Sequence, residues 1–202
     1  MKHWIWVGGW GLSSSEQQCA FAERWPEFEH TVLVPDSLCI AELVRFCREY
    51  EVERIGGYSL GAFLLLREYA QLPELPIMLL APILDFKREA LKGGRVDGRR
   101  LSVLLRWLRR DPLAALQDFY QQAGIARDAS EVLPYDFDAL YWGIEQLAGP
   151  GVEHWRRDNI RACVGERDHL LDAVQLQQRW PDLLILPDAG HDFKELLQEV
   201  AV

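Results

Sequence analysis

Short apolar runs alternate with helical segments along most of this chain. Six runs bounded by turn residues have the length and composition of buried parallel strands, namely residues 4–7, 31–34, 55–58, 77–80, 160–164 and 183–186. Segments with helical periodicity lie between or after them, at residues 16–24, 40–50, 60–71, 171–179 and 193–201. Strands that alternate with helices form right-handed crossovers and a sheet covered on both faces. The sequence therefore predicts an α/β protein with a compact, mostly parallel sheet of about six strands.

The alternation breaks once, between about Phe86 and Gly149, where several helical pieces follow one another. Asp111 and Pro112 are typical of a helix start, with aspartate as the N-cap and proline at the first helical position. Asp136 or Asp138 begins another helix, and residues 101–110 form a third helical piece. We therefore predict a core made of residues 1–85 and 150–202, with residues 86–149 as a helical cap inserted at the edge of the sheet.

Composition excludes several classes of partner. A formal charge of −9 disfavours nucleic acid, which is bound through basic surfaces. No stretch approaches the roughly 20 apolar residues that cross a bilayer, so no membrane association is expected. The first residues run straight into a predicted strand and lack the pattern of a secretory signal, and the four cysteines lack a disulfide-framework spacing. These features predict a cytoplasmic protein.

The charge is unevenly distributed. Between Lys87 and Arg110 nine basic residues face two acidic ones, an excess of seven positive charges in a chain that is acidic elsewhere. Charge runs of this kind are usually solvated helix faces.

The pentapeptide from Gly57 to Gly61 fits the G-x-S-x-G nucleophile elbow, in which a strand ends in a sharp turn that exposes a serine. Here it lies between a predicted strand and a predicted helix, which is the context that the elbow requires. Glycines two places either side of Ser59 are expected because side chains there would collide with the neighbouring strand and helix. The alternative is a glycine-rich helix entry with an ordinary capping serine.

A serine hydroxyl needs a nearby base to act as a nucleophile, and histidine has the suitable pKa. His191 follows the last predicted strand and precedes the last helix, which places it at the carboxyl edge of the sheet beside the elbow. His3, His30 and His154 precede strands and are expected at the opposite edge, and His169 is interpreted as a loop residue. His191 is therefore the candidate base.

The base in turn needs a carboxylate that holds the imidazole in the correct tautomer. Asp168, after the strand at residues 160–164, is the candidate acid, and the order Ser, acid, His is typical of this type of elbow. Asp85, after the strand at residues 77–80, is the alternative acid.

Backbone amides are expected to stabilise the negative oxygen of a tetrahedral intermediate. Leu60, directly after the serine, supplies one amide, and the loop from Gly8 to Gly11 supplies the other, with Trp10 as the favoured donor. A tight strand-to-helix turn is the alternative reason for the loop glycines. The sequence predicts no cofactor and contains no convincing metal cluster.

Five stretches together resemble a known family. They are WVGGWGL at 6–12, GGYSLGA at 56–62, LYWGIEQLAG at 140–149, VGERD at 164–168 and DAGH at 188–191. In this order they resemble the pimeloyl-acyl carrier protein methyl ester esterases of biotin synthesis, although residues 86–149 match only loosely. The elbow and the GxxD…GH pattern are shared by the whole α/β-hydrolase superfamily, whereas GWGL and GIEQL point to this family. The resemblance implies the α/β-hydrolase fold, and it places the nucleophile, acid, base and oxyanion amides on Ser59, Asp168, His191, Trp10 and Leu60.

The chain also departs from this family. The family usually has His-Gly where this chain has Gly8-Gly9, its LPGxG loop is shortened here to residues 35–38, and its leading hairpin is missing. These changes leave the three catalytic candidates in place and predict a more open entrance to the site.

The resemblance further implies a substrate and a partner. Members of the family hydrolyse the methyl ester of a pimeloyl chain on acyl carrier protein, and they dock this acidic carrier through cap arginines. The corresponding candidates here are Arg99, Arg100, Arg106, Arg109 and Arg110. Three alternatives remain: a general short-chain carboxylesterase or thioesterase acting on small esters, a lyase that uses the triad as a base, and a non-catalytic carrier-binding module.

Overall fold

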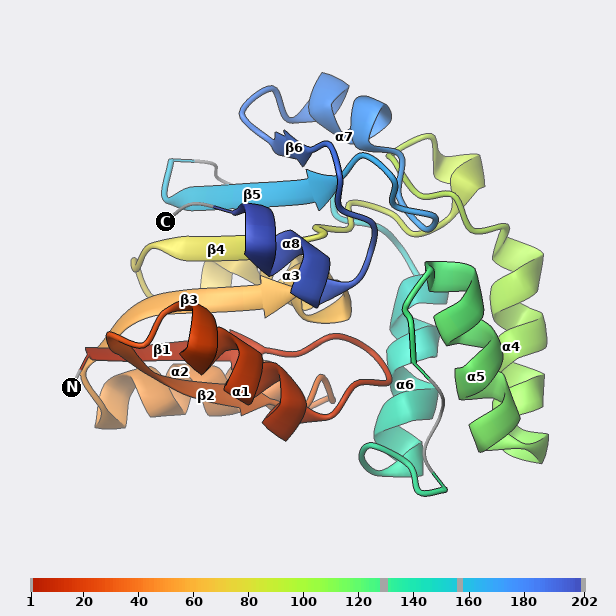
Figure 1. Cartoon of the computed structure of the whole chain (residues 1–202), viewed down its shortest axis with the longest axis horizontal. Helices are drawn as coiled ribbons and strands as arrows, with labels where there is room; N and C mark the ends of the chain where they lie inside the picture. Colours follow the sequence, from red (N-terminus) through yellow and green to blue (C-terminus); the bar gives the residue numbers. More distant parts are fainter. Residues whose placement is uncertain (1, 128–130, 156–157, 201–202) are drawn as a thin grey trace.

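A single parallel sheet forms the centre of the computed structural model, which describes residues 2–127, 131–155 and 158–200. Within these residues six strands pair in the order β2-β1-β3-β4-β5-β6 (Figure 1). The strands are β1 (Lys2–Val7), β2 (Phe28–Leu33), β3 (Val52–Tyr58), β4 (Ile77–Leu80), β5 (Ile160–Gly165) and β6 (Leu184–Leu186). The predicted fold class is confirmed. Strands β1 to β3 begin two or three residues earlier than predicted, because their first residues include polar side chains that an apolar run does not contain.

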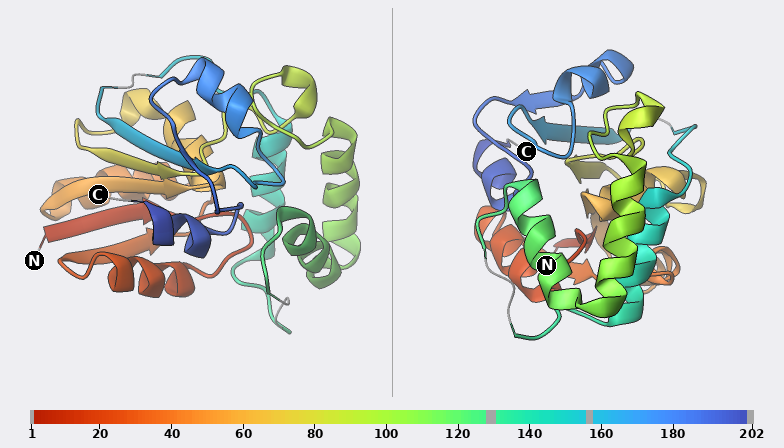
Figure 2. Two further views of the ribbon diagram at one scale, coloured as in Figure 1. Left: turned by 45° about the horizontal axis from the view of Figure 1, so that its top comes forward. Right: turned by 90° about the vertical axis from the view of Figure 1, so that its right-hand side faces the viewer.

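Helices cover both faces of this sheet. Among the described residues they are α1 (Ser14–Arg24), α2 (Cys39–Glu49), α3 (Leu60–Arg67), α4 (Gly98–Arg110), α5 (Pro112–Ala123), α6 (Phe137–Ala148), α7 (Ala173–Arg179) and α8 (Phe193–Glu199). Helices α1 and α8 lie on one face and α2 and α3 on the other (Figures 1 and 2). None of the described helices is long and apolar enough to cross a membrane.

Two helix ends differ from the prediction for identifiable reasons. The helix expected over residues 60–71 stops at Arg67, and a separate 3₁₀ turn follows at Tyr69–Gln71. The helix expected from residue 171 starts at Ala173, because the side chain of Asp172 caps it by accepting a hydrogen bond from the Gln175 amide at 3.0 Å. Residue 201, the predicted end of the last helix, lies outside the described residues.

Helices α4, α5 and α6 form a group between β4 and β5, and we call them the α4–α6 group. They lie beyond the carboxyl ends of the strands and pack against one another (Figures 1 and 2). Asp111 caps α5 through a 3.0 Å bond from the Ala114 amide, with Pro112 at the first position, as predicted. Of the two candidate starts for the next helix, Asp136 is the cap. The division into a core and a cap stays a prediction, and residues 1, 128–130, 156–157 and 201–202 of those ranges lie outside the described residues.

An aromatic cluster fills the space between α1 and strands β1 and β2. The ring of Trp6 stacks on Phe21, with centroids 4.0 Å apart, and on Trp4 at 4.7 Å. His30 is buried in this cluster, within β2 and not before it as predicted; its Nδ1 accepts from Trp6 Nε1 at 3.1 Å and its Nε2 lies 3.0 Å from the Trp25 carbonyl oxygen. Nδ1 is therefore the unprotonated nitrogen and Nε2 the donor.

This burial makes the fold sensitive to mild acid. Burial lowers the pKa of His30 below its usual value of 6.5, so the unfolded chain takes up a proton at a higher pH than the folded chain. The His30 contribution to stability is therefore complete above about pH 6.5 and is lost as the pH falls through the lowered pKa. Urea unfolding at pH 7.5 and 5.5 measures this effect. The free energy of unfolding of the wild type should fall between pH 7.5 and pH 5.5, and the fall should be smaller in His30→Gln. Equal losses in both proteins would exclude His30 as the cause.

Candidate active site

Three side chains from separate parts of the sequence meet at the carboxyl edge of the sheet. Ser59 follows β3, Asp168 follows β5 and His191 follows β6. Ser59 Oγ lies 2.9 Å from His191 Nε2, and His191 Nδ1 lies 2.7 Å from Asp168 Oδ2. The three residues are 5%, 0% and 1% exposed in chain order, so this hydrogen-bonded chain is screened from water. The structure thus brings together the predicted nucleophile, acid and base.

The backbone at Ser59 is held in a conformation that L-residues rarely adopt. Its φ is +53° and its ψ −111°, and the next residue begins α3. Such strain persists only where the surroundings fix it and is typical of functional sites. A Cβ on Gly61 would lie 2.0 Å from the Val7 carbonyl oxygen, and one on Gly57 would lie 2.9 Å from the Ala62 amide nitrogen. Both elbow glycines are therefore required by close backbone approach, as expected.

The loop after β5 fixes the orientation of Asp168. Its Oδ1 accepts hydrogen bonds from the amides of Leu170 at 2.8 Å and Leu171 at 2.9 Å, which leaves Oδ2 for His191. Arg95 Nη1 donates to the Asp168 carbonyl oxygen at 2.7 Å. Because a carboxylate only accepts, the shared proton lies on His191 Nδ1, and Nε2 presents its lone pair to the serine hydroxyl.

Asp85, the alternative acid, has a different partner. It is 6% exposed and lies after β4, where it accepts from the Lys87 amide at 3.0 Å and pairs with Lys87 Nζ at 3.5 Å. Its contacts do not include His191, whose carboxylate partner is Asp168. Of the other histidines, His169 is exposed and His3 bonds Thr31 Oγ1 at 3.0 Å.

The two predicted oxyanion donors lie on adjacent segments. Leu60 is the first residue of α3, and Trp10 lies in the loop between β1 and α1. The Gly61 amide donates to the Gly8 carbonyl oxygen at 3.1 Å, which joins the two segments. Within the described residues no acceptor is bonded to the amide of Trp10 or of Leu60. Both groups are therefore available for a negative oxygen.

Comparisons with known proteins identify the architecture. No protein-family model matches the chain, and no curated protein matches it. Among solved structures, an esterase (EaEST) from Exiguobacterium antarcticum is 13% identical, with a TM-score of 0.68 over 98% of this chain and 91% of its own. A thermophilic esterase from Thermogutta terrifontis is 13% identical, with a TM-score of 0.67 over 98% and 86%. The chain has the α/β-hydrolase fold. BioG from Haemophilus influenzae is 14% identical, with a TM-score of 0.52 over 94% and 89%.

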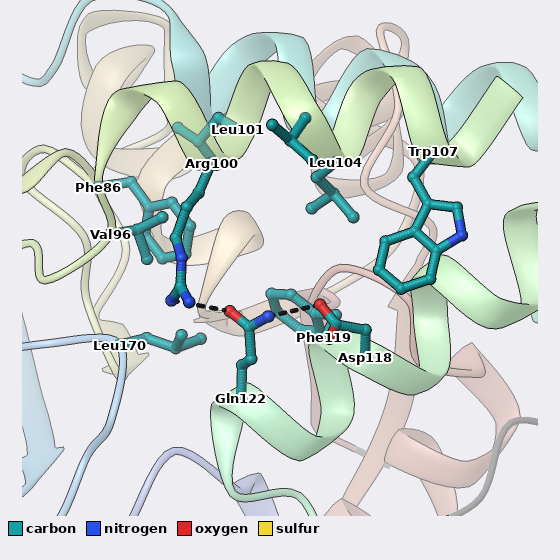
Figure 3. Close-up of a pocket in the computed structure, with 11 residues that line it drawn as sticks. Phe86, Val96, Arg100, Leu101, Leu104, Trp107, Asp118, Phe119, Gln122 and Leu170 are labelled. Carbon is teal, nitrogen blue, oxygen red and sulfur yellow. Dashed lines mark hydrogen bonds between the residues drawn. The ribbon is translucent and has the colours of Figure 1, made fainter.

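One pocket of this α/β-hydrolase fold lies between α4 and α5 (Figure 3). Its volume is about 380 Å³, and its lining residues are Phe86, Val96, Arg100, Leu101, Val103, Leu104, Trp107, Asp118, Phe119, Gln122 and Leu170. Two of them touch the site: the Phe119 ring packs edge-on against Trp10 at 4.7 Å, and the Leu170 amide binds Asp168. On its polar side Arg100 Nη1 donates to Gln122 Oε1 at 3.3 Å, and Gln122 Nε2 donates to Asp118 at 2.5 Å.

In residues 2–127, 131–155 and 158–200, no three His, Cys, Asp or Glu side chains are grouped so that they could hold a metal ion.

Sequence reasoning missed two residues that position the site. Tyr58 Oη donates to the His191 carbonyl oxygen at 2.8 Å, and burial raises the pKa of Tyr58, which keeps the phenol a donor. Gln17, fully buried in α1, accepts from the Gly9 amide at 3.0 Å through Oε1. Tyr58 occupies a variable position of the elbow motif and Gln17 a polar position of a helix. Neither pattern indicates these partners.

Removing the Tyr58 hydroxyl tests its role. Tyr58→Phe leaves the His191 carbonyl buried without its donor, which costs about 1–3 kcal/mol in the free energy of unfolding. Urea unfolding measures the loss, and Tyr50→Phe is the control because Tyr50 is 53% exposed. An unchanged unfolding midpoint for Tyr58→Phe would contradict this role.

Proposed function

We propose that this chain is a serine hydrolase that cleaves carboxylic esters. The observation that carries the proposal is the buried chain of hydrogen bonds from Ser59 through His191 to Asp168, which begins at a strained serine. A hydroxyl, an imidazole and a carboxylate in this order activate the hydroxyl for attack on an acyl carbon. The esterases among the structurally similar proteins support the same function.

In the first half-reaction Ser59 Oγ attacks the ester carbonyl carbon while His191 Nε2 takes the hydroxyl proton. The carbonyl oxygen becomes negative and is stabilised by the amides of Trp10 and Leu60. Asp168 holds the imidazole and stabilises the imidazolium that forms. When the intermediate collapses, the carbon–oxygen bond to the alcohol breaks, and His191 returns the proton to the departing alcohol.

In the second half-reaction a water molecule attacks the acyl-serine. His191 Nε2 takes a proton from this water, and the same two amides stabilise the second negative oxygen. Collapse breaks the bond to Ser59 Oγ, which recovers its proton from His191. The products are a carboxylic acid and the original enzyme.

The substrate we propose is the methyl ester of a pimeloyl chain on acyl carrier protein, as the sequence resemblance implies. The pocket between α4 and α5 supports this choice, because most of its lining is apolar. Two of its lining residues also contact the site: Phe119 packs against the Trp10 ring, and the Leu170 amide binds Asp168. Pockets of this size class bind small apolar ligands. Methanol would then leave in the first half-reaction.

The basic helix α4 supports a carrier partner. All five candidate arginines on it are exposed: Arg99, Arg100, Arg106, Arg109 and Arg110. Arg109 also lies over the Tyr141 ring, 4.5 Å from its centroid. A positive surface on an otherwise acidic chain would attract an acidic carrier and make association dependent on salt. A cytoplasmic location belongs to the same proposal, since all four cysteines are free thiols.

The substrate is tested with purified protein and pimeloyl methyl ester on its carrier, with the free acid followed by mass spectrometry. We expect release of the acid. In the triple variant Arg99→Glu, Arg106→Glu, Arg110→Glu, kcat/KM should fall about tenfold or more for the carrier-bound ester and stay unchanged for p-nitrophenyl butyrate. Arg45→Glu, an exposed arginine on α2, is the matched control. No release from the carrier, alongside normal hydrolysis of the small ester, would favour a general short-chain esterase.

A further inference from the structure

Hydrogen bonds hold the backbone of the loop from Gly8 to Gly11, which carries Trp10. The Gly8 amide donates to the Leu33 carbonyl oxygen at 3.0 Å, and the Gly9 amide donates to Gln17 Oε1 at 3.0 Å. The Gly11 amide donates to Tyr135 Oη at 2.8 Å. Among the four amides from Gly8 to Gly11, only that of Trp10 has no bonded acceptor within the described residues.

Gly11 is held on both sides of its backbone by tyrosine hydroxyls. While Tyr135 Oη accepts from its amide, Tyr120 Oη donates to its carbonyl oxygen at 2.5 Å. Gly11 has a φ of +71°, in the left-handed region, so the chain turns sharply at this residue. The two bonds therefore fix the peptide groups that follow Trp10.

Both tyrosines come from outside the sheet and its covering helices. Tyr120 lies in α5, and Tyr135 lies in the segment that leads into α6. The Trp10 side chain is held from the same side, because its Nε1 donates to the Leu140 carbonyl oxygen of α6 at 2.8 Å. Burial raises the pKa of both phenols, which keeps them neutral near pH 7. The loop is thus attached by three hydrogen bonds to α5, to α6 and to the segment that leads into α6.

We propose that Tyr120 and Tyr135 are positioning residues for the oxyanion hole, because together they orient the loop so that the Trp10 amide points to the reacting carbonyl oxygen. This inference rests on the proposed esterase function and extends it. Catalysis by a backbone amide depends on its being oriented before charge develops. The α4–α6 group therefore takes part in the chemical step, through the loop, as well as in forming the pocket.

The test uses Tyr120→Phe, Tyr135→Phe and the double variant of the full chain. With p-nitrophenyl butyrate as substrate, kcat should fall about tenfold in each single variant and about a hundredfold in the double variant. KM should stay within about twofold, because the ester ground state makes little use of the oxyanion donors. Tyr141→Phe in α6 is the matched control, since the Tyr141 ring faces Arg109 and its bonds do not include the loop.

A second measurement separates positioning from general loss of structure. Butylboronic acid forms a tetrahedral adduct with an active serine, so its inhibition constant reports the oxyanion hole directly. This constant should rise by the same factor by which kcat falls. A normal kcat in both single variants would overturn the inference and leave the esterase proposal intact. A reduced kcat with an unchanged inhibition constant for butylboronic acid would do the same. Absence of ester hydrolysis by the wild-type chain would overturn both.

Discussion

Replacing Ser59 with alanine is expected to lower kcat for p-nitrophenyl butyrate by roughly 10⁴- to 10⁶-fold. The methyl group cannot attack the acyl carbon, and only binding and the oxyanion donors remain to accelerate hydrolysis by water. The variant should fold normally, because alanine adds no atom at this site. Ester hydrolysis measures the loss. Mass spectrometry after treatment with a fluorophosphonate should find the label on Ser59 of the wild type and no label in Ser59→Ala.

Ser102→Ala is the control for this result, since Ser102 is an exposed residue of α4. It should retain both activity and labelling. A Ser59→Ala protein that keeps most of its ester hydrolysis would reject the nucleophile. A wild-type chain that neither hydrolyses esters nor takes the label would favour a non-catalytic carrier-binding protein.

Asp168→Asn is expected to lower kcat by roughly 10⁴-fold. An asparagine side chain can turn its NH₂ group toward His191 Nδ1, which favours the tautomer that carries the proton on Nε2. The ring nitrogen that faces Ser59 would then be unable to accept the serine proton. Steady-state hydrolysis of p-nitrophenyl butyrate between pH 6 and 9 measures the effect.

Asp85→Asn is the matched control, because it makes the same change in the alternative acid. Its carboxylate pairs with Lys87, so this variant should lose stability and keep the kcat of the folded enzyme within about threefold. The opposite pattern, an active Asp168→Asn and an inactive Asp85→Asn, would assign the acid to Asp85.

The sequence carried enough information for the sheet and for the three residues of the hydrogen-bonded chain. Parallel strands bring their carboxyl ends to one edge, so residues in the segments that follow strands, such as Ser59 and His191, could be placed together from the sequence. The elbow glycines added a local signal, because G-x-S-x-G needs its strand and helix on either side. Both signals depend on residues close in sequence to a strand end.

The support for the site could not be predicted in the same way. Tyr120 and Tyr135 contact Gly11 across more than one hundred residues, and Tyr58 reaches His191 across 133. A tyrosine in a helix or loop is most often a packing residue, and nothing in its neighbours indicates a distant carbonyl or amide. The starts of β1 at Lys2 and of β3 at Val52 were predicted too late for a related reason. Pairing with a neighbouring strand extends a strand beyond its apolar run.

The point where the chain leaves the sheet and returns to it has an evolutionary consequence. Strands β4 and β5 are neighbours, and the Val152 amide donates to the Leu84 carbonyl oxygen at 2.6 Å, so the two ends of the segment that carries helices α4 to α6 lie next to each other. A segment joined in this manner can be lengthened, shortened or exchanged at little entropic cost to the sheet. Any exchanged segment must nevertheless bring its own partners for Gly11. Related proteins in which this segment differs should therefore also differ in the loop between β1 and α1, because the groups that bind the backbone of that loop come from the segment.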